Sequence, residues 1–161
     1  MLGVGSEAPD FELPSYTGES VRLSKLLSEG KVVVLYFYPR AMTPGCSREA
    51  VRFKELLKEF EELGAVVLGV STDSVERLRR FAEKYGLQGL TLLSDVNADV
   101  VRAYGALKEG VKRPSALRVT FIIGTDGKVV AVLKNVRPAE KHADEALRIV
   151  KELKQGRREG S

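Results

Sequence analysis

The chain has 161 residues, of which 43% are hydrophobic and 30% charged, a composition typical of a globular domain rather than of a disordered or collagen-like protein. This length suits one domain, which we expect over residues 1–155, followed by a disordered basic tail at residues 156–161. Half of the net charge of +4 lies in the last eight residues, and elsewhere basic and acidic residues are interspersed along the chain. The sequence therefore lacks the basic stripe that would indicate a nucleic-acid partner.

Membrane and export segments are also not expected. No run approaches the roughly 18 consecutive apolar residues of a membrane span, and the first residues have neither the basic nor the apolar region of a secretory signal. We therefore expect a cytoplasmic protein without a membrane partner. The scarcity of Asn and Gln beside many charged residues suggests a thermophilic source.

The chain contains one cysteine, Cys46, and one histidine, His142. These counts exclude an intramolecular disulfide, a CxxC redox pair and a Cys-rich or multi-histidine metal site. We expect neither a metal nor another cofactor. His142 stands near the start of the last predicted helix, where we expect an exposed residue without a function.

The first predicted strand covers residues 31–38, which are β-branched or aromatic on both alternate faces and end before Pro39, as in a central strand buried on both sides. Over residues 43–63, apolar residues then recur at intervals of three and four residues, and Gly64 follows as a residue that ends helices. This spacing predicts an amphipathic helix.

A second buried strand is predicted at residues 65–71 and a helix at residues 75–85, whose N-cap is Thr72, Asp73 or Ser74. The alternation of strand and helix predicts parallel strands.

The second half of the chain gives a weak strand at residues 91–94 and a short helix at residues 97–104. Strands at residues 117–123 and 128–133 flank Asp126-Gly127, a dipeptide favoured in hairpin turns, and a helix covers residues 138–153. We therefore predict an α/β fold with a mixed central sheet, parallel in its first half, and helices on both faces.

The connection from the first strand to the first helix is the favoured place for a site, because ligands bind at the carboxyl ends of strands in open α/β sheets. Thr43 suits the N-cap and Pro44 the first helical position, which places Cys46 in the first turn. There the helix dipole and free backbone N–H groups favour a thiolate over a thiol. The alternative is that Cys46 is a small buried hydrophobic residue.

The same segment, Pro39-x-x-x-Thr43-x-x-Cys46, resembles the active-site motif PxxxTxxC of the peroxiredoxins, and Arg118-Val-Thr-Phe resembles the downstream arginine strand of that family. The resemblance covers roughly residues 5–150. It looks closest to the bacterioferritin-comigratory, or PrxQ, subgroup because of the sequence Thr-Pro-Gly-Cys around the cysteine. It implies a thioredoxin-like fold.

The resemblance also implies a function, the thiol-dependent reduction of hydrogen peroxide or alkyl hydroperoxides. Cys46 would be the nucleophile and would become a sulfenic acid. Thr43, Arg118 and backbone N–H groups near Cys46 would stabilise the negative charge as the O–O bond breaks, and Pro39 would shield the site from water. Thr43 can also act purely as an N-cap.

The alternation along the strand at residues 117–123 places Arg118 on a partly buried face, where a guanidinium needs an anionic partner. The Cys46 thiolate is one candidate. Glu49, one helical turn after Cys46, is another, although Glu49 also fits an ordinary acid near a helix N-terminus. The sequence also allows an Arg118 that is exposed at the edge of the sheet. In that case Arg113, in the loop before this strand, is the other candidate cation.

The chain departs from many PrxQ relatives because Val51 stands where they carry a resolving cysteine. The resemblance then implies a one-cysteine cycle reduced by an external thiol, which can be thioredoxin, glutaredoxin or a small molecule. The alternatives are a peroxide sensor or holdase that uses Cys46 without efficient turnover, and a domain with an inert Cys46. The sequence is compatible with a homo-oligomer and does not indicate the oligomeric state.

Overall fold

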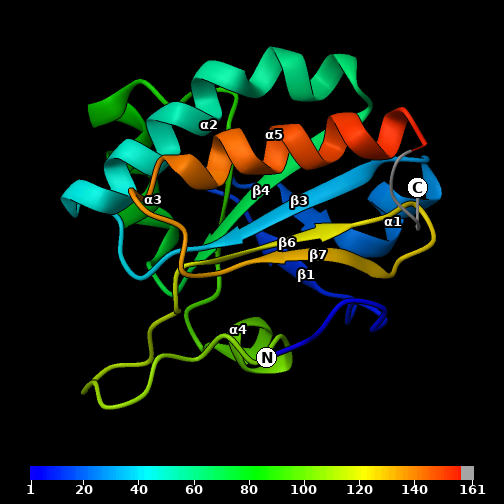
Figure 1. The fold of residues 1–161 in the computed structure, drawn as a ribbon. Helices are drawn as coiled ribbons and strands as arrows, with labels where there is room; N and C mark the ends of the chain where they lie inside the picture. The colour runs from blue at the N-terminus through cyan, green and yellow to red at the C-terminus, as the bar shows by residue number, and fades with distance from the viewer. Residues whose placement is uncertain (157–161) are drawn as a thin grey trace.

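The computed structural model describes residues 1–156, which form a five-stranded mixed sheet between helices and a separate two-stranded sheet (Figure 1). In chain order the elements are β1 (Glu12–Pro14), β2 (Ser20–Arg22), α1 (Leu23–Ser28), β3 (Val32–Phe37), α2 (Pro44–Glu62), β4 (Ala65–Ser71), α3 (Val75–Tyr85), β5 (Thr91–Ser94), α4 (Asp99–Ala103), β6 (Val119–Ile123), β7 (Val129–Leu133) and α5 (Lys141–Lys154).

The central strand is β3. It pairs in parallel with β4 and antiparallel with β6, in the sheet order β5-β4-β3-β6-β7. All six of its residues are buried, as expected for a run that is apolar on both faces. β4 and β5 are parallel and β6 and β7 antiparallel, so the predicted division of the sheet is confirmed.

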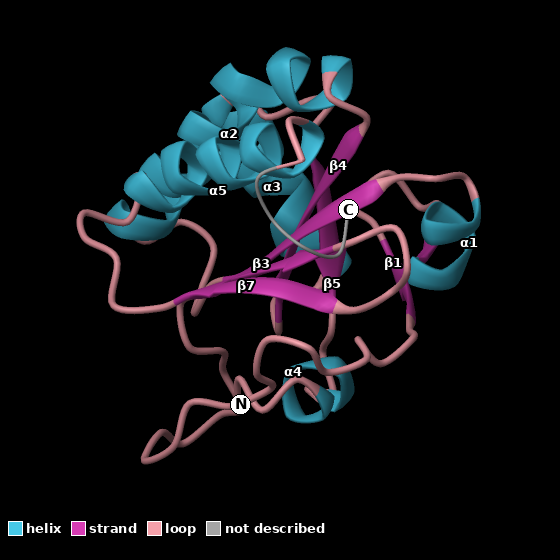
Figure 2. Cartoon of the chain, turned by 45° about the vertical axis from the view of Figure 1, so that its right-hand side comes forward, coloured by secondary structure: helices cyan, strands magenta, loops and turns pink. Residues whose placement is uncertain are grey.

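Each face of the sheet has its own hydrophobic cluster. Val34 and Tyr36 of β3 pack with α2, α3 and α5 on one face. Leu35 and Phe37 pack on the other face with α4, α1 and the β1–β2 sheet. Figure 2 shows α2, α3 and α5 gathered on one side, with α1 and α4 elsewhere around the sheet. The predicted α/β class with helices on both faces is therefore confirmed.

Most predicted boundaries agree with the structure. β4, α3 and β5 match the predicted ranges, and Ser74 caps α3 by accepting a hydrogen bond from the Arg77 amide at 3.1 Å. β6 begins two residues and α5 three residues later than predicted. The β1–β2 sheet and α1 have no counterpart among the predicted elements. Of the predicted tail, residues 157–161 lie outside the described residues.

Within the described part of the chain, no helix has both the length and the apolar character that crossing a membrane requires.

A close contact between β3 and β4 fixes the packing of α2 on the sheet. Gly69 lies opposite Tyr36, whose ring stacks on Phe53 of α2 with centroids 4.2 Å apart. A Cβ at position 69 would stand 2.7 Å from Cζ of Tyr36. Because that ring is held between the sheet and Phe53, it has little room to move.

We expect Gly69→Ala to lower the free energy of unfolding by about 1–3 kcal/mol, the usual cost of overpacking a core. Urea denaturation of both proteins measures this loss. The matched control is Gly3→Ala, because a Cβ at Gly3 has nothing within 4 Å. Equal stability of Gly69→Ala and the wild type would show that Tyr36 can move away.

Candidate active site

The connection from β3 to α2 places the cysteine in the first turn of a helix. Thr43 is the N-cap residue of α2 in extended conformation, and Pro44 occupies the first helical position, as predicted. The Thr43 side chain does not cap the helix, however, which corrects the expected role of its hydroxyl. It donates instead to the carbonyl oxygen of Arg40 at 2.8 Å, while the Thr43 carbonyl accepts from both the amide and the hydroxyl of Ser47.

This connection is anchored to the end of β4. The Asp73 carboxylate accepts hydrogen bonds from the Ala41 amide at 2.8 Å and from the Ser71 hydroxyl at 2.7 Å. Arg77 donates to the Ala41 carbonyl at 2.8 Å and forms an ion pair with Asp73. Because β3 and β4 are parallel, their carboxyl ends lie together and allow these contacts.

Cys46 is 1% exposed, and its main polar neighbour is Arg118. The Arg118 Nη2 donates to Sγ over 3.3 Å, and Nη1 donates to Oε1 of Glu49 at 2.5 Å. Among residues 1–156, Arg118 is the one hydrogen-bond donor to Sγ. A single guanidinium therefore contacts both the sulfur and the carboxyl group.

Arg118 reaches this place because it immediately precedes β6, beside β3. Its side chain is 24% exposed, and the alternate residue Thr120 is fully buried on the predicted face. The sequence left two candidate partners for Arg118, Cys46 and Glu49, and the Arg118 side chain contacts both. The competing cation Arg113 lies exposed in the loop before β6.

Glu49 is completely buried, so it is not an ordinary acid on the surface of the first helical turns. Burial raises the pKa of Glu49 to about 8, although the charge and the hydrogen bond of Arg118 act to lower it. Its Oε2 has no hydrogen-bond partner among residues 1–156, so the contact with Arg118 through Oε1 is the polar contact that holds this carboxyl group.

His142 is 1% exposed, and the prediction of a surface histidine is wrong. Its Nδ1 is 3.0 Å from the Thr120 hydroxyl, with which it forms a hydrogen bond, and 4.0 Å from Oε2 of Glu49. Burial, with a contribution from the charge of Arg118, lowers the pKa of His142 to about 4. The neutral imidazole thus completes a buried polar layer behind the cysteine.

A sequence signal for the buried histidine existed. His142 precedes Ala146, Ile149 and Leu153 by four, seven and eleven residues, which places it on the apolar stripe of α5. The prediction failed because it weighed the polar neighbours of His142 rather than its helical phase.

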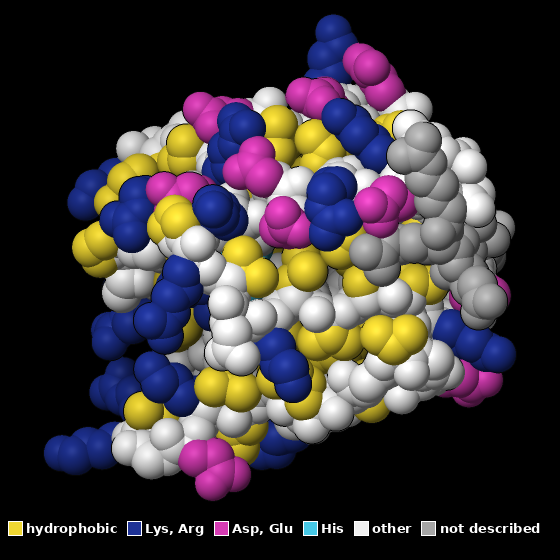
Figure 3. Space-filling model, viewed as in Figure 1, with side chains coloured by type: hydrophobic (Ala, Val, Ile, Leu, Met, Phe, Trp, Pro, Cys, Tyr) yellow, Lys and Arg dark blue, Asp and Glu magenta, His cyan; other side chains and the backbone are white. Residues whose placement is uncertain are grey.

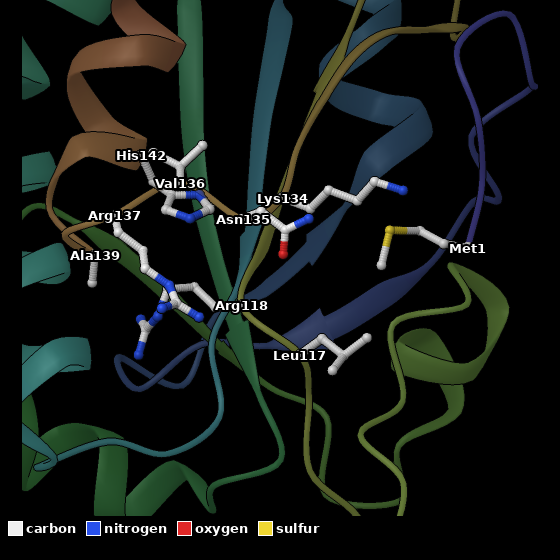
Figure 4. A pocket seen from close by; sticks show the side chains of 9 residues that line it. All are labelled: Met1, Leu117, Arg118, Lys134, Asn135, Val136, Arg137, Ala139 and His142. Atoms are coloured by element: carbon white, nitrogen blue, oxygen red, sulfur yellow. The ribbon is translucent and has the colours of Figure 1, made fainter.

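The outer side of this polar layer opens into a cavity of about 390 Å³ between α5 and the ends of β6 and β7. Its lining includes Arg118, Arg137 and His142, and in Figure 4 the side chains of Arg118 and Arg137 extend toward the same part of the cavity. The guanidinium that contacts Cys46 is thus reached from this side as well. Among residues 1–156 no group of three or more His, Cys, Asp or Glu side chains is placed to hold a metal ion.

The shifted pKa of His142 has a consequence for stability. Its pKa falls from 6.5 to about 4 on folding. Between these values the unfolded chain binds the proton more readily, so acidification through this range destabilises the fold. We expect the titration of His142 to lower the free energy of unfolding by about 3 kcal/mol as the pH falls from 6.5 to 4.

The measurement is urea denaturation of the wild type and of His142→Gln across this range. Other titrating groups are common to both proteins, so the difference between their stabilities isolates His142. We expect the wild type to lose its advantage over the variant as the pH falls. A difference that does not change with pH would contradict the burial of a neutral imidazole.

Several known proteins are similar to this chain in sequence. A model of the AhpC/TSA family matches residues 4–132. Peroxiredoxin Bcp of Bacillus subtilis (strain 168) is 38% identical over 155 residues, which cover 94% of this chain and 97% of that protein.

Two solved structures are also similar. Peroxidoxin BcpB from Mycobacterium tuberculosis has a TM-score of 0.87 at 41% identity, covering 95% of this chain and 99% of that one. The bacterioferritin comigratory protein of Xanthomonas campestris, whose structures concern alkyl peroxide reduction, has a TM-score of 0.83 at 32% identity, covering 96% and 98%. The chain therefore belongs to the AhpC/TSA family and, within it, is a peroxiredoxin of the Bcp/PrxQ group, a thiol-dependent peroxidase with a thioredoxin-like fold.

Proposed function

We propose that Cys46 is the peroxidatic nucleophile and that it reduces hydrogen peroxide and alkyl hydroperoxides through a sulfenic acid. The contact that carries this proposal is the hydrogen bond from Arg118 to Sγ. A cation at this distance stabilises negative charge on sulfur, and the thiolate is the reactive form of cysteine. The alkyl peroxide reduction named for the Xanthomonas campestris relative supports the wider substrate class.

In the proposed step the Cys46 thiolate attacks the terminal oxygen of the hydroperoxide. An S–O bond forms while the O–O bond breaks, which gives the sulfenic acid and an alkoxide or hydroxide that takes up a proton from water. Negative charge spreads from sulfur toward the leaving oxygen during this step. The Arg118 guanidinium is positioned to follow that charge, so it stabilises the transition state more than the ground state.

Glu49 is a positioning residue in this proposal. It lies one turn after Cys46 on α2, and its Oε1 fixes the orientation of the guanidinium. Burial raises the pKa of Glu49 and the charge of Arg118 opposes that rise, so the carboxyl group and the guanidinium act as one hydrogen-bonded pair.

Thr43 and Pro39 border the site from the other side. The Thr43 hydroxyl, which now donates to the Arg40 carbonyl, is free to turn toward a bound peroxide because a hydroxyl rotates about its C–O bond. Pro39 is half-buried, and its carbonyl accepts a hydrogen bond from Ser115, so it forms a fixed wall.

The rate of Cys46 oxidation by hydrogen peroxide tests these roles in a single turnover without added thiol. We expect Cys46→Ser to be inactive and Arg118→Gln to be about 10²–10³-fold slower, the usual cost of removing one donor to a developing charge. Glu49→Gln should stay within about threefold of the wild type, because an amide oxygen also accepts from Arg118, whereas Glu49→Leu should be at least tenfold slower.

Stopped-flow tyrosine fluorescence and mass spectrometry of the trapped sulfenic acid provide the measurement. Folding of each variant is checked by its circular dichroism. An Arg118→Gln protein that reacts as fast as the wild type would refute the proposed role of Arg118. A wild-type rate no higher than that of a small free thiol would refute the peroxidatic role of Cys46 and leave an inert cysteine.

We further propose a cycle with one cysteine and an external thiol reductant, since Cys46 is the single cysteine of the chain. The sulfenic acid cannot be protected by an intrachain disulfide and is therefore open to further oxidation. Thioredoxin, glutaredoxin and small thiols are the reductants to compare.

We expect turnover with excess peroxide and limiting thiol to inactivate the enzyme progressively, with a mass gain of two oxygen atoms on Cys46 as sulfinic acid forms. Intact-mass spectrometry and residual activity should change in parallel. Activity that persists through many turnovers without this mass gain would contradict the expectation. Oxidation without turnover by any thiol would instead favour the peroxide sensor or holdase.

A further inference from the structure

A second cavity lies on the Thr43 side of the site. Its volume is about 800 Å³, and its lining includes Pro39 and Thr43 at the start of α2. We call it the basic groove, because four of its lining residues are exposed cations and two are exposed valines: Arg40, Lys108, Lys112, Arg113, Val96 and Val111.

The charge of the basic groove is not balanced within the protein. None of its four exposed cations forms an ion pair with any of residues 1–156. A fifth cation of the lining, Arg77, is paired with Asp73, the one acidic residue that the described lining contains. Figure 3 shows Lys and Arg side chains gathered at the lower left, where Figure 1 places the loop before β6. Such a groove attracts an anion.

The walls of the basic groove are joined to the reactive site. The Ser115 hydroxyl donates to the Pro39 carbonyl at 2.9 Å, and the Thr72 hydroxyl donates to the Pro114 carbonyl at 2.9 Å. Three residues after Ser115 the chain reaches Arg118, which contacts Cys46. The groove is therefore held between the two segments that lead to Cys46 and to Arg118.

We propose that the basic groove binds the carboxylates of a small anionic thiol and that this thiol reduces oxidised Cys46. The inference rests on the proposed function, because it names the reductant of that same site. The chain lacks a second cysteine, so the reducing sulfur comes from another molecule. The groove supplies cations for the carboxylates of such a molecule, and its lining residue Thr43 stands three residues before Cys46 in the chain.

Size favours a small molecule over a protein. A volume of about 800 Å³ lies within the usual range of small-molecule sites. Cys46 is almost fully buried and lies three residues beyond Thr43, which corresponds to about 5 Å along the helix axis. The opening that a slender thiol needs in order to reach Sγ is narrower than the opening that a folded protein needs.

The reduction proceeds in two balanced steps. The sulfur of the small thiol attacks the sulfur of the Cys46 sulfenic acid, an S–S bond forms, the S–O bond breaks, and water leaves. A second thiol molecule then attacks the mixed disulfide, which releases the Cys46 thiol and the disulfide of the small thiol. The peroxide of the proposed function is the oxidant, and the small thiol is the reductant.

The kinetic test compares glutathione, which carries two carboxylates, with its diethyl ester. The protein is first oxidised by one equivalent of peroxide and then mixed with either thiol, and formation of the mixed disulfide is followed by mass spectrometry. Rates are normalised to the reaction of each thiol with a small reference disulfide. We expect glutathione to react about tenfold faster than the ester at low ionic strength, with the advantage disappearing in high salt.

The double variant Lys112→Gln with Arg113→Gln should lose most of this preference and keep its rate with the ester. The matched control is the double variant Lys54→Gln with Lys58→Gln, which removes the same charge from α2 outside the groove and should keep the preference. Equal rates of glutathione and the ester with the wild type, or an equal preference in both double variants, would overturn the proposal. So would acceleration by an acidic dithiol protein alone.

A binding measurement separates this inference from the proposed function. S-methylglutathione cannot reduce a sulfenic acid, and it can be titrated into the reduced protein while amide NMR shifts are recorded. We expect shifts at Val96 and Val111 that the groove variant loses and that S-methylglutathione diethyl ester does not produce. Shifts confined to other regions would overturn the groove even if Cys46 reacts with peroxide. Failure of the oxidation step with these shifts intact would overturn the proposed function alone.

Discussion

The site depends on one guanidinium that is shared between two buried groups able to carry negative charge. Arg118 contacts the sulfur of Cys46 and the carboxyl group of Glu49, both on the first turns of α2. A partly buried cation needs such partners, so the fold favours the arrangement that brings the residue before β6 to the first turns of α2. Because β6 pairs with β3 and α2 packs on β3 through the stacked Tyr36 and Phe53, the position of the guanidinium is set by the core of the sheet.

The remaining polar groups near Cys46 fall into two regions with different physical characters. Behind Arg118, His142 and Thr120 form a buried polar layer in which burial lowers the pKa of the imidazole and raises the pKa of the Glu49 carboxyl. On the Thr43 side, the chain instead presents exposed cations at the mouth of the basic groove. The first region holds Arg118 in place, whereas the second presents to solvent positive charge that is unpaired among residues 1–156.

Periodicity predicted the central strand and the first two long helices well, because β3 is apolar on both faces and α2 and α3 have clear helical stripes. It also predicted the first-turn position of Cys46 and the buried face of Arg118. It missed the β1–β2 sheet and α1, whose short segments of three to six residues carry too little periodic signal. The hydrogen bond of Thr43 to Arg40 is a local turn contact that competes with the expected helix cap. The burial of His142 follows its helical phase on α5, which the polar neighbours of His142 obscured.

The separation of the two halves of the site along the chain has a consequence for protein synthesis. Cys46 and Arg118 lie 72 residues apart, and β6 is added to the sheet only after β3, α2, β4 and β5 have been made. At synthesis rates of about 5–20 residues per second, the ribosome needs several seconds to complete that interval. During this time the nascent chain carries a cysteine without its guanidinium partner, so the contact between Cys46 and Arg118 forms only after β6 has joined the sheet.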